Sequence, residues 1–160
     1  MHNAVHETVD IIYVPCYLNG TDGIFNTSYY DLLIGMDACV FSSYYEPWGY
    51  TPHESLSFGI PTITTNLAGF GQWILSTFGD DMAESGCRVI NRTDSNYHAA
   101  VDAIASSLSE LLAMRPAQIK HLRAAAMTAS RRAEWTQFIE YYDEAYSRAI
   151  DSRLTKLNKK

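Results

Sequence analysis

Four short runs of apolar and β-branched residues stand between polar, glycine-containing stretches, and they predict four β-strands. They cover residues 11–14 (IIYV), 38–42 (ACVFS), 62–65 (TITT) and 87–90 (CRVI). Runs of this kind, without strict alternation of apolar and polar positions, are typical of parallel strands that are buried on both faces. The fourth run contains an arginine and has the character of an edge strand.

Apolar residues recur at helical spacing between and after these runs, and they predict helices. The predicted helices cover residues 28–36, 51–58, 69–74, 97–113, 116–130 and 135–150. Ser28 is a plausible N-cap for the first of them. The second has three start signals, which are Thr51 as the N-cap, Pro52 at the first helical position and Glu54 in a capping box. Gly59 ends this helix.

Strands that alternate with helices predict an α/β fold with a parallel sheet and right-handed crossovers. We expect a partial Rossmann-like domain of about four parallel strands flanked by helices, with a C-terminal helical segment. The domain is expected to cover residues 1–150, and residues 151–160 are expected to form a frayed tail. Ligands of such sheets bind at the carboxyl ends of the strands, which directs attention to residues 42–51 and 65–71.

Composition and charge exclude several functional classes. The chain has 160 residues, 47% of them hydrophobic, and a net charge of −6. A core of useful size can therefore be buried, whereas an acidic chain is a poor partner for nucleic acid. No apolar run reaches the roughly 20 residues that span a bilayer, and the first residues do not resemble a signal peptide. We therefore expect a cytoplasmic protein with no membrane and no nucleic-acid partner.

The cysteines and histidines predict neither a disulfide framework nor a metal site. Cys16, Cys39 and Cys87 are an odd number and contain no CxxC pair, so we interpret them as buried thiols in a reducing compartment. Four histidines lack metal-ligand spacing; they are His2, His6, His98 and His121. No metal is expected.

The stretch from Tyr44 to Gly71 carries the candidate chemistry. Glu46 follows a predicted parallel strand, and Glu54 lies eight residues later in the first turn of the next predicted helix. Both carboxylates should therefore face the ligand crevice. Gly49, between them, permits close approach of the backbone, and the N-terminus of the helix offers free N–H groups to a phosphate.

This stretch resembles a known family. YYEPWGYTPHE, followed by GIPTITTNLAGFG, is similar to the donor site of glycogen synthases of the animal and fungal type, which are retaining glycosyltransferases with the GT-B fold. The resemblance covers residues 11–71 closely and is weaker beyond them. It implies the C-terminal domain of that fold and transfer of glucose from UDP-glucose or ADP-glucose to the α-1,4-glucan of glycogen. It implies no cofactor and no metal.

The resemblance also implies roles for individual residues. Glu46 would be catalytic, contacting the donor glucose near the anomeric carbon, where a carboxylate favours oxocarbenium character in the transition state. Glu54 would accept hydrogen bonds from the ribose.

Five further residues would form the rest of the donor site. Backbone groups of Trp48, Gly49 and Tyr50 would line the sugar and the phosphates. The N–H of Thr51 would bind phosphate, and Tyr29 would stack on the base.

Simpler roles stay open for several of these residues. Glu54 could merely close a capping box, and Tyr29 could be an ordinary core or surface aromatic. Trp48 could serve packing alone. His53 is expected to be exposed or to lie behind the residues that contact ligand.

The chain departs from the family pattern at two places. The strand–helix unit that carries the phosphate-binding Arg and Lys of the family, and the acceptor-side domain, have no counterpart in the sequence. We therefore expect the C-terminal portion of such an enzyme, inactive alone and partnered by the missing N-terminal part. The alternative is a non-catalytic nucleotide-binding or interaction module. The helix that is Arg-rich in the family keeps Arg123, Arg131 and Arg132 but is otherwise Ala-rich.

The resemblance also bears on the sheet. It matches residues 11–14 to the third strand of the family domain and residues 38–42 to the fourth, and in the order 3-2-1-4 two strands separate them. Unpaired backbone groups along an apolar strand are costly. We therefore expect residues 11–14 to pair directly with residues 38–42. Otherwise the bare edge would pair with a second copy and give a homo-oligomer.

Overall fold

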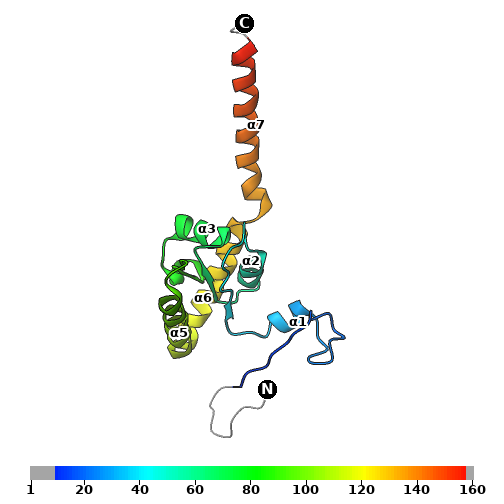
Figure 1. Cartoon of the computed structure of the whole chain (residues 1–160), viewed down its shortest axis with the longest axis vertical. Helices are drawn as coiled ribbons and strands as arrows, with labels where there is room; N and C mark the ends of the chain where they lie inside the picture. Colours follow the sequence, from blue (N-terminus) through cyan, green and yellow to red (C-terminus); the bar gives the residue numbers. More distant parts are fainter. Residues whose placement is uncertain (1–9, 158–160) are drawn as a thin grey trace. The chain divides into compact units, whose positions relative to one another are not determined.

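The computed structural model describes residues 10–157, which fall into two units. The first ends at Met36 and contains one short helix, α1 (Tyr29–Leu33). The second begins at Asp37 and contains all the other described helices and strands, of which Figure 1 labels α2, α3, α5, α6 and α7. Ser28 caps α1 as expected, because its hydroxyl accepts a hydrogen bond from the amide of Asp31.

A parallel sheet of three strands lies at the centre of the second unit. The strands are β1 (Cys39–Val40), β2 (Thr62–Thr65) and β3 (Cys87–Ile90), in the order β1-β2-β3. In the register of the sheet, Cys39 lies beside Thr62 and Ile63 lies beside Arg88. All four residues of β2 are buried, as a central strand requires. The predicted edge position of residues 87–90 is confirmed.

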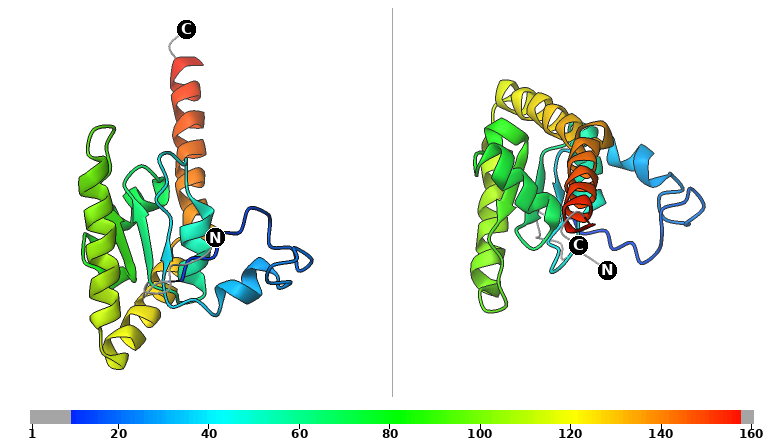
Figure 2. Two further views of the ribbon diagram at one scale, coloured as in Figure 1. Left: turned by 60° about the horizontal axis from the view of Figure 1, so that its bottom comes forward. Right: turned by 90° about the horizontal axis from the view of Figure 1, so that it is seen from above.

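Helices cover both faces of this sheet. They are α2 (Tyr50–Ser57), α3 (Gly69–Phe78), α4 (Met82–Ser85), α5 (Tyr97–Ala113), α6 (Pro116–Arg132) and α7 (Trp135–Leu157). On one face, Val89 packs in a cluster with residues of α2, α3 and α6. On the other face, the neighbouring Ile90 packs with residues of α4, α5 and α6. Figure 2 shows α5 and α2 on opposite sides of the sheet.

The prediction of a strand at residues 11–14 is wrong. These residues form no strand in the structure, and β1 has a ladder only with β2 among the described residues. Ile11, Ile12 and Tyr13 are 61–68% exposed. The predicted direct pairing with residues 38–42 is therefore also wrong. An apolar run supplies side chains for a core, but a strand also needs a neighbouring backbone to accept its hydrogen bonds.

Two helix boundaries also differ from their predictions. The N-cap of α2 is Gly49, with φ 100°, so Thr51 is the second helical residue and forms no capping box with Glu54. Pro52 becomes the third helical residue, where its missing N–H still costs nothing. At the other end of the chain, α7 continues beyond Ile150 to Leu157, into the segment that was expected to fray.

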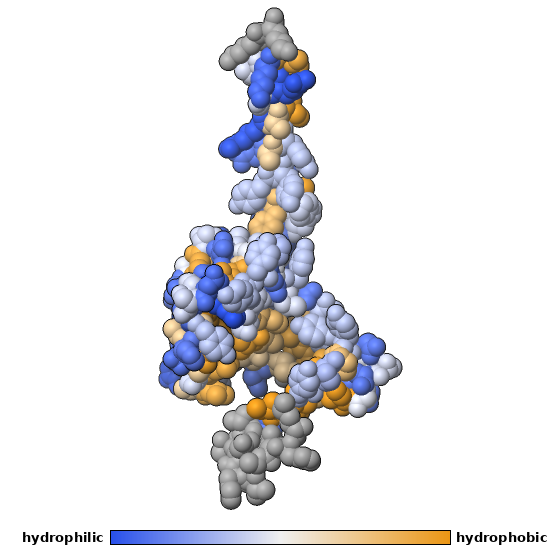
Figure 3. Space-filling view, in the orientation of Figure 1, coloured by the Kyte–Doolittle hydropathy of each residue, from blue (hydrophilic) through white to orange (hydrophobic). Residues whose placement is uncertain are grey.

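Helix α7 exposes most of its apolar side chains. None of its residues is buried, and Figure 3 shows apolar residues beside hydrophilic ones along it. Tyr141 and Tyr146 are 68% and 62% exposed, so their side chains do not belong to the core. No helix within residues 10–157 is long and apolar enough to cross a membrane.

The three cysteines differ in their surroundings. Cys16 is exposed, Cys39 is half-buried and Cys87 is buried, so the prediction of three buried thiols is wrong for Cys16. Burial raises the pKa of Cys39 above its usual range. It raises the pKa of Cys87 to about 12. Because only the thiolate is nucleophilic, the three thiols should react at very different rates.

We expect a water-soluble thiol reagent at pH 8 to label Cys16 first and Cys39 more slowly. Cys87 should resist until the chain unfolds, since its thiol is both buried and protonated. Mass spectrometry of peptides after timed labelling gives the order. Labelling in denaturant serves as the control, and Cys87 reacting as fast as Cys16 in the folded chain would contradict the packing of β3.

Candidate active site

The candidate site lies where the parallel strands end. The loop from Phe41 to Gly49 follows β1, residues 66–68 follow β2, and residues 91–96 follow β3. These are the carboxyl ends of the strands, where open α/β sheets bind ligands. The predicted location of the site is thus the meeting point of three loops in the structure.

The loop that carries Glu46 rests on the start of α3. The amide of Glu46 donates to the carbonyl of Leu67 at 3.2 Å, and the amide of Gly69 donates to the carbonyl of Glu46 at 3.1 Å. The amide of Phe70 donates to the carbonyl of Trp48. The first amides of α3 are therefore used to hold the loop, whereas the N-terminus of α2 remains open to a ligand.

The carboxylate of Glu46 is held by its own loop. Its Oε1 accepts a hydrogen bond from the hydroxyl of Ser43 at 3.0 Å, and the side chain is half-buried. Its Oε2 lies 2.9 Å from the position that a Cβ on residue 49 would occupy. Gly49 is thus required twice, for its left-handed φ and for the space that the Glu46 carboxylate takes.

The N-terminus of α2 presents unpaired backbone donors. The N-cap is a glycine without a side-chain hydrogen bond to the helix. Within residues 10–157, the amides of Tyr50 and Thr51 donate to no acceptor. Such amides, together with the helix dipole, favour an anion such as a phosphate. The predicted role of the Thr51 amide is compatible with this geometry.

Glu54 lies in α2 one turn after Tyr50 and is half-buried. Residues four apart share a helix face, so Glu54 lies on the face that continues from the open N-terminus. The capping role proposed for it is wrong, because the helix begins at Gly49. A ribose-binding role for Glu54 remains a prediction.

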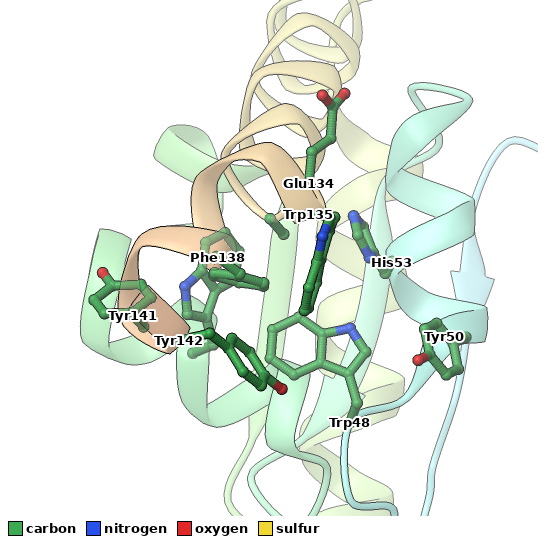
Figure 4. A pocket seen from close by; sticks show the side chains of 10 residues that line it. Trp48, Tyr50, His53, Glu134, Trp135, Phe138, Tyr141 and Tyr142 are labelled. Carbon is green, nitrogen blue, oxygen red and sulfur yellow. The ribbon is translucent and has the colours of Figure 1, made fainter. Parts of the chain in front are cut away.

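The side chain of Trp48 is part of an aromatic cluster. Its ring lies 5.5 Å from that of Phe70 and 5.4 Å from that of Phe138, both edge to face. The same ring, with Tyr50 and Trp135, lines a pocket of about 810 Å³ between α2, α3 and the first turns of α7 (Figure 4). Neither Glu46 nor Glu54 lines this pocket. The Trp48 side chain packs in this aromatic cluster, and the predicted role of its backbone at the donor site stays a prediction.

His53 was expected to be exposed or to lie behind the residues that contact ligand; it is half-buried and lines the same pocket as Trp48 and Tyr50. Its Nε2 lies 3.2 Å from the carbonyl of Ser130, and its ring stacks on Phe70 with centroids 5.2 Å apart. The contact with Ser130 ties α2 to the end of α6. His53 thus fixes the direction in which the open end of α2 points.

Three residues at the site were not predicted from the sequence: Ser43, Asn66 and Arg92. Ser43 holds the Glu46 carboxylate. Asn66 accepts a hydrogen bond from the amide of Arg92 at 2.6 Å. The signal available in the sequence is their position, since each follows the end of a parallel strand.

Tyr29 belongs to the first unit. Its ring lies 5.3 Å from that of Tyr30, edge to face. Because the two units are described separately, its stacking role toward a base stays a prediction. Within residues 10–157, no group of three or more His, Cys, Asp or Glu side chains is arranged to hold a metal ion.

Comparison with known proteins places the chain among its relatives. The glycogen synthase family model matches residues 1–158. The chain is 34% identical over 113 residues to glycogen [starch] synthase isoform 1 of Saccharomyces cerevisiae, covering 70% of this chain and 16% of that protein. It is 28% identical over 151 residues to the glycogen [starch] synthase of Caenorhabditis elegans, covering 94% of this chain and 22% of that protein. The corresponding protein of Neurospora crassa is 32% identical over 110 residues, with coverages of 69% and 15%.

The chain therefore spans between 15% and 22% of the length of these three relatives. The family match includes the loop of Glu46, the N-terminus of α2 and the sheet that supports them. On the extent of this match, the chain belongs to the glycogen synthase family.

Proposed function

We propose that this chain supplies the nucleotide-sugar site of a retaining glycosyltransferase that passes glucose from UDP-glucose or ADP-glucose to a growing α-1,4-glucan. The observation that carries the proposal is the placement of one half-buried carboxylate, Glu46, beside the open N-terminus of α2 at the carboxyl edge of a parallel sheet. The family match over the same residues supports it.

Each part of the site has a task in this reaction. The amides of Tyr50 and Thr51 bind the diphosphate, whose negative charge grows as the glycosidic bond to it breaks. Glu46 lies beside the glucose and stabilises the positive charge that develops at the anomeric carbon. Glu54 accepts hydrogen bonds from the ribose hydroxyls. Because Glu46 is half-buried, water screens its carboxylate less than that of an exposed residue, so it interacts more strongly with the positive charge at the anomeric carbon.

The remaining parts of the reaction belong to the rest of a longer protein. The phosphate-binding Arg and Lys and the acceptor-side domain would come from the portion of the relatives that this chain does not match. We propose that the longer protein works in the cytoplasm and needs no metal, since an open helix N-terminus and basic side chains can neutralise the diphosphate. The family match across the site favours this transferase over a non-catalytic module.

We expect calorimetry of this chain to detect binding of either UDP and UDP-glucose or ADP and ADP-glucose, with one base preferred. Glu54→Gln should weaken binding of the preferred diphosphate about tenfold, because a hydrogen bond to a charged group is stronger than one to an amide. Glu110→Gln is the control, since Glu110 pairs with Arg88 on the surface. Binding of none of the four ligands, or equal effects of both substitutions, would contradict the proposal.

A further inference from the structure

The side chain of Arg92 lies against the loop that carries Glu46. Its Nη1 donates a hydrogen bond to the carbonyl of Ser42, and its guanidinium lies 4.7 Å from the centroid of the Tyr44 ring. The contact joins residues fifty positions apart in the sequence. A planar guanidinium can stack on a ring and donate from its edge at the same time, which a lysine ammonium cannot do.

The loop after β3 holds the same segment at a second point. The hydroxyl of Tyr44 donates to Oδ1 of Asp94 at 2.6 Å, and this bond raises the pKa of Tyr44 above its usual range. The backbone of Arg92 is itself fixed, since its amide donates to Oδ1 of Asn66 at 2.6 Å. The loop after β3 is thus anchored to the loop after β2, and it also holds the loop after β1.

Ser43 lies between the two residues that are held in this way. Its carbonyl accepts a hydrogen bond from Oγ1 of Thr65 at 2.8 Å. Its hydroxyl donates to Oε1 of Glu46 at 3.0 Å. The orientation of Ser43 therefore decides where the Glu46 carboxylate lies, and Arg92 fixes the residues on both sides of Ser43.

We propose that Arg92 is a positioning residue that sets the Glu46 carboxylate against the donor sugar, acting through Ser42, Ser43 and Tyr44. The inference rests on the proposed function, because it assigns the sugar to Glu46. Arg92 does not touch the substrate. Its contribution is to keep one orientation of the loop, so that no binding energy is spent on ordering it.

The test measures the affinity of the chain for the nucleoside diphosphate and for its glucose conjugate. The unaltered chain is compared with the variants Arg92→Met and Arg92→Lys. The affinity for the diphosphate should change less than twofold, because the N-terminus of α2 is untouched. The gain in affinity from the glucose should fall about tenfold in Arg92→Met, and Arg92→Lys should not restore it, since the stacked, forked geometry is lost. Arg88→Met is the matched control, because Arg88 lies on β3 and pairs with Glu110 instead.

A second measurement needs no ligand. The amide of Glu46 donates to the carbonyl of Leu67, and the amide of Gly69 donates to the carbonyl of Glu46. Because these two bonds hold the loop in place, the hydrogen exchange of both amides should quicken in Arg92→Met. The amide of Thr62, which donates to Gly86 in the sheet, should keep its rate in that variant. Arg88→Met should leave all three amides unchanged. Unchanged exchange at Glu46 and Gly69 in Arg92→Met would overturn the inference whatever the ligand result.

The two proposals fail in different ways. If the unaltered chain binds no nucleotide, or if the glucose adds nothing to the binding affinity, the proposed function is contradicted. A normal glucose contribution in the unaltered chain that persists in Arg92→Met would overturn the role of Arg92 and leave the proposed function standing.

Discussion

Replacing Glu46 with Gln is expected to lower glucose transfer about 100- to 1000-fold, the range found when one electrostatic stabiliser of a transition state is removed. The substitution keeps the shape of the side chain and its bond from Ser43 but removes the charge. Because the partner of Glu46 is the sugar and not the nucleotide, the loss should fall on kcat, and the affinity for the diphosphate should stay nearly unchanged.

The measurement requires a longer protein, so we suggest a chimaera in which this chain replaces the matching segment of the Saccharomyces cerevisiae relative. Incorporation of labelled glucose into glycogen gives kcat and KM. Glu84→Gln is a suitable control, since Glu84 is exposed on α4, away from the three loops of the site. Equal, small effects of both substitutions would mean that Glu46 has only a structural role.

Replacing Gly69 with Ala is expected to destabilise the fold by about 1–3 kcal/mol, the usual cost of forcing a methyl group into packed surroundings. The new Cβ would lie 2.1 Å from the carbonyl oxygen of Pro47 and 3.3 Å from Cα of Trp48. Both neighbours are backbone atoms, so the loop of Glu46 would have to leave the start of α3. The substitution should therefore both displace the loop of Glu46 and lower the stability of the domain.

Urea denaturation followed by tryptophan fluorescence measures this change, because Trp48 lies in the affected loop and Trp73 packs against Trp48. Gly35→Ala is the control. A Cβ on residue 35 would lie 3.4 Å from the carbonyl of Leu32, an ordinary contact, and its φ is not left-handed. We expect that variant to be neutral. A Gly69→Ala chain as stable as the unaltered one would show that the loop does not rest on α3 as described.

Local pattern was sufficient for the elements whose partners lie close in the sequence. Helices α5 and α6 begin at Tyr97 and Pro116 as predicted, because apolar spacing and a proline at the first position are properties of the segment itself. The strands at residues 62–65 and 87–90 have the predicted bounds, and the strand predicted at residues 38–42 is present as the shorter β1. The long motif around Glu46 and Glu54 also identified the family, which the comparisons then confirmed.

Local pattern failed where two segments had the same signal and different surroundings. Residues 11–14 are as apolar and β-branched as a buried strand, yet they form none, because a strand exists only with a hydrogen-bonded neighbour. At α2, the sequence predicted Thr51 as the N-cap, but the helix begins after Gly49. Gly49 is the N-cap because it adopts the left-handed φ found there and because its missing side chain leaves room for the Glu46 carboxylate.

The sequence by itself therefore determined the α/β class, most helices, the three strands of the sheet and the loop that carries the candidate chemistry. Only the tertiary structure decided what holds that loop in place. Arg92 and Asp94 meet Ser42 and Tyr44 across fifty residues of sequence, and no periodicity links such positions. They become neighbours because parallel pairing brings the carboxyl ends of β1, β2 and β3 to one edge of the sheet, a consequence of backbone hydrogen bonds between distant segments.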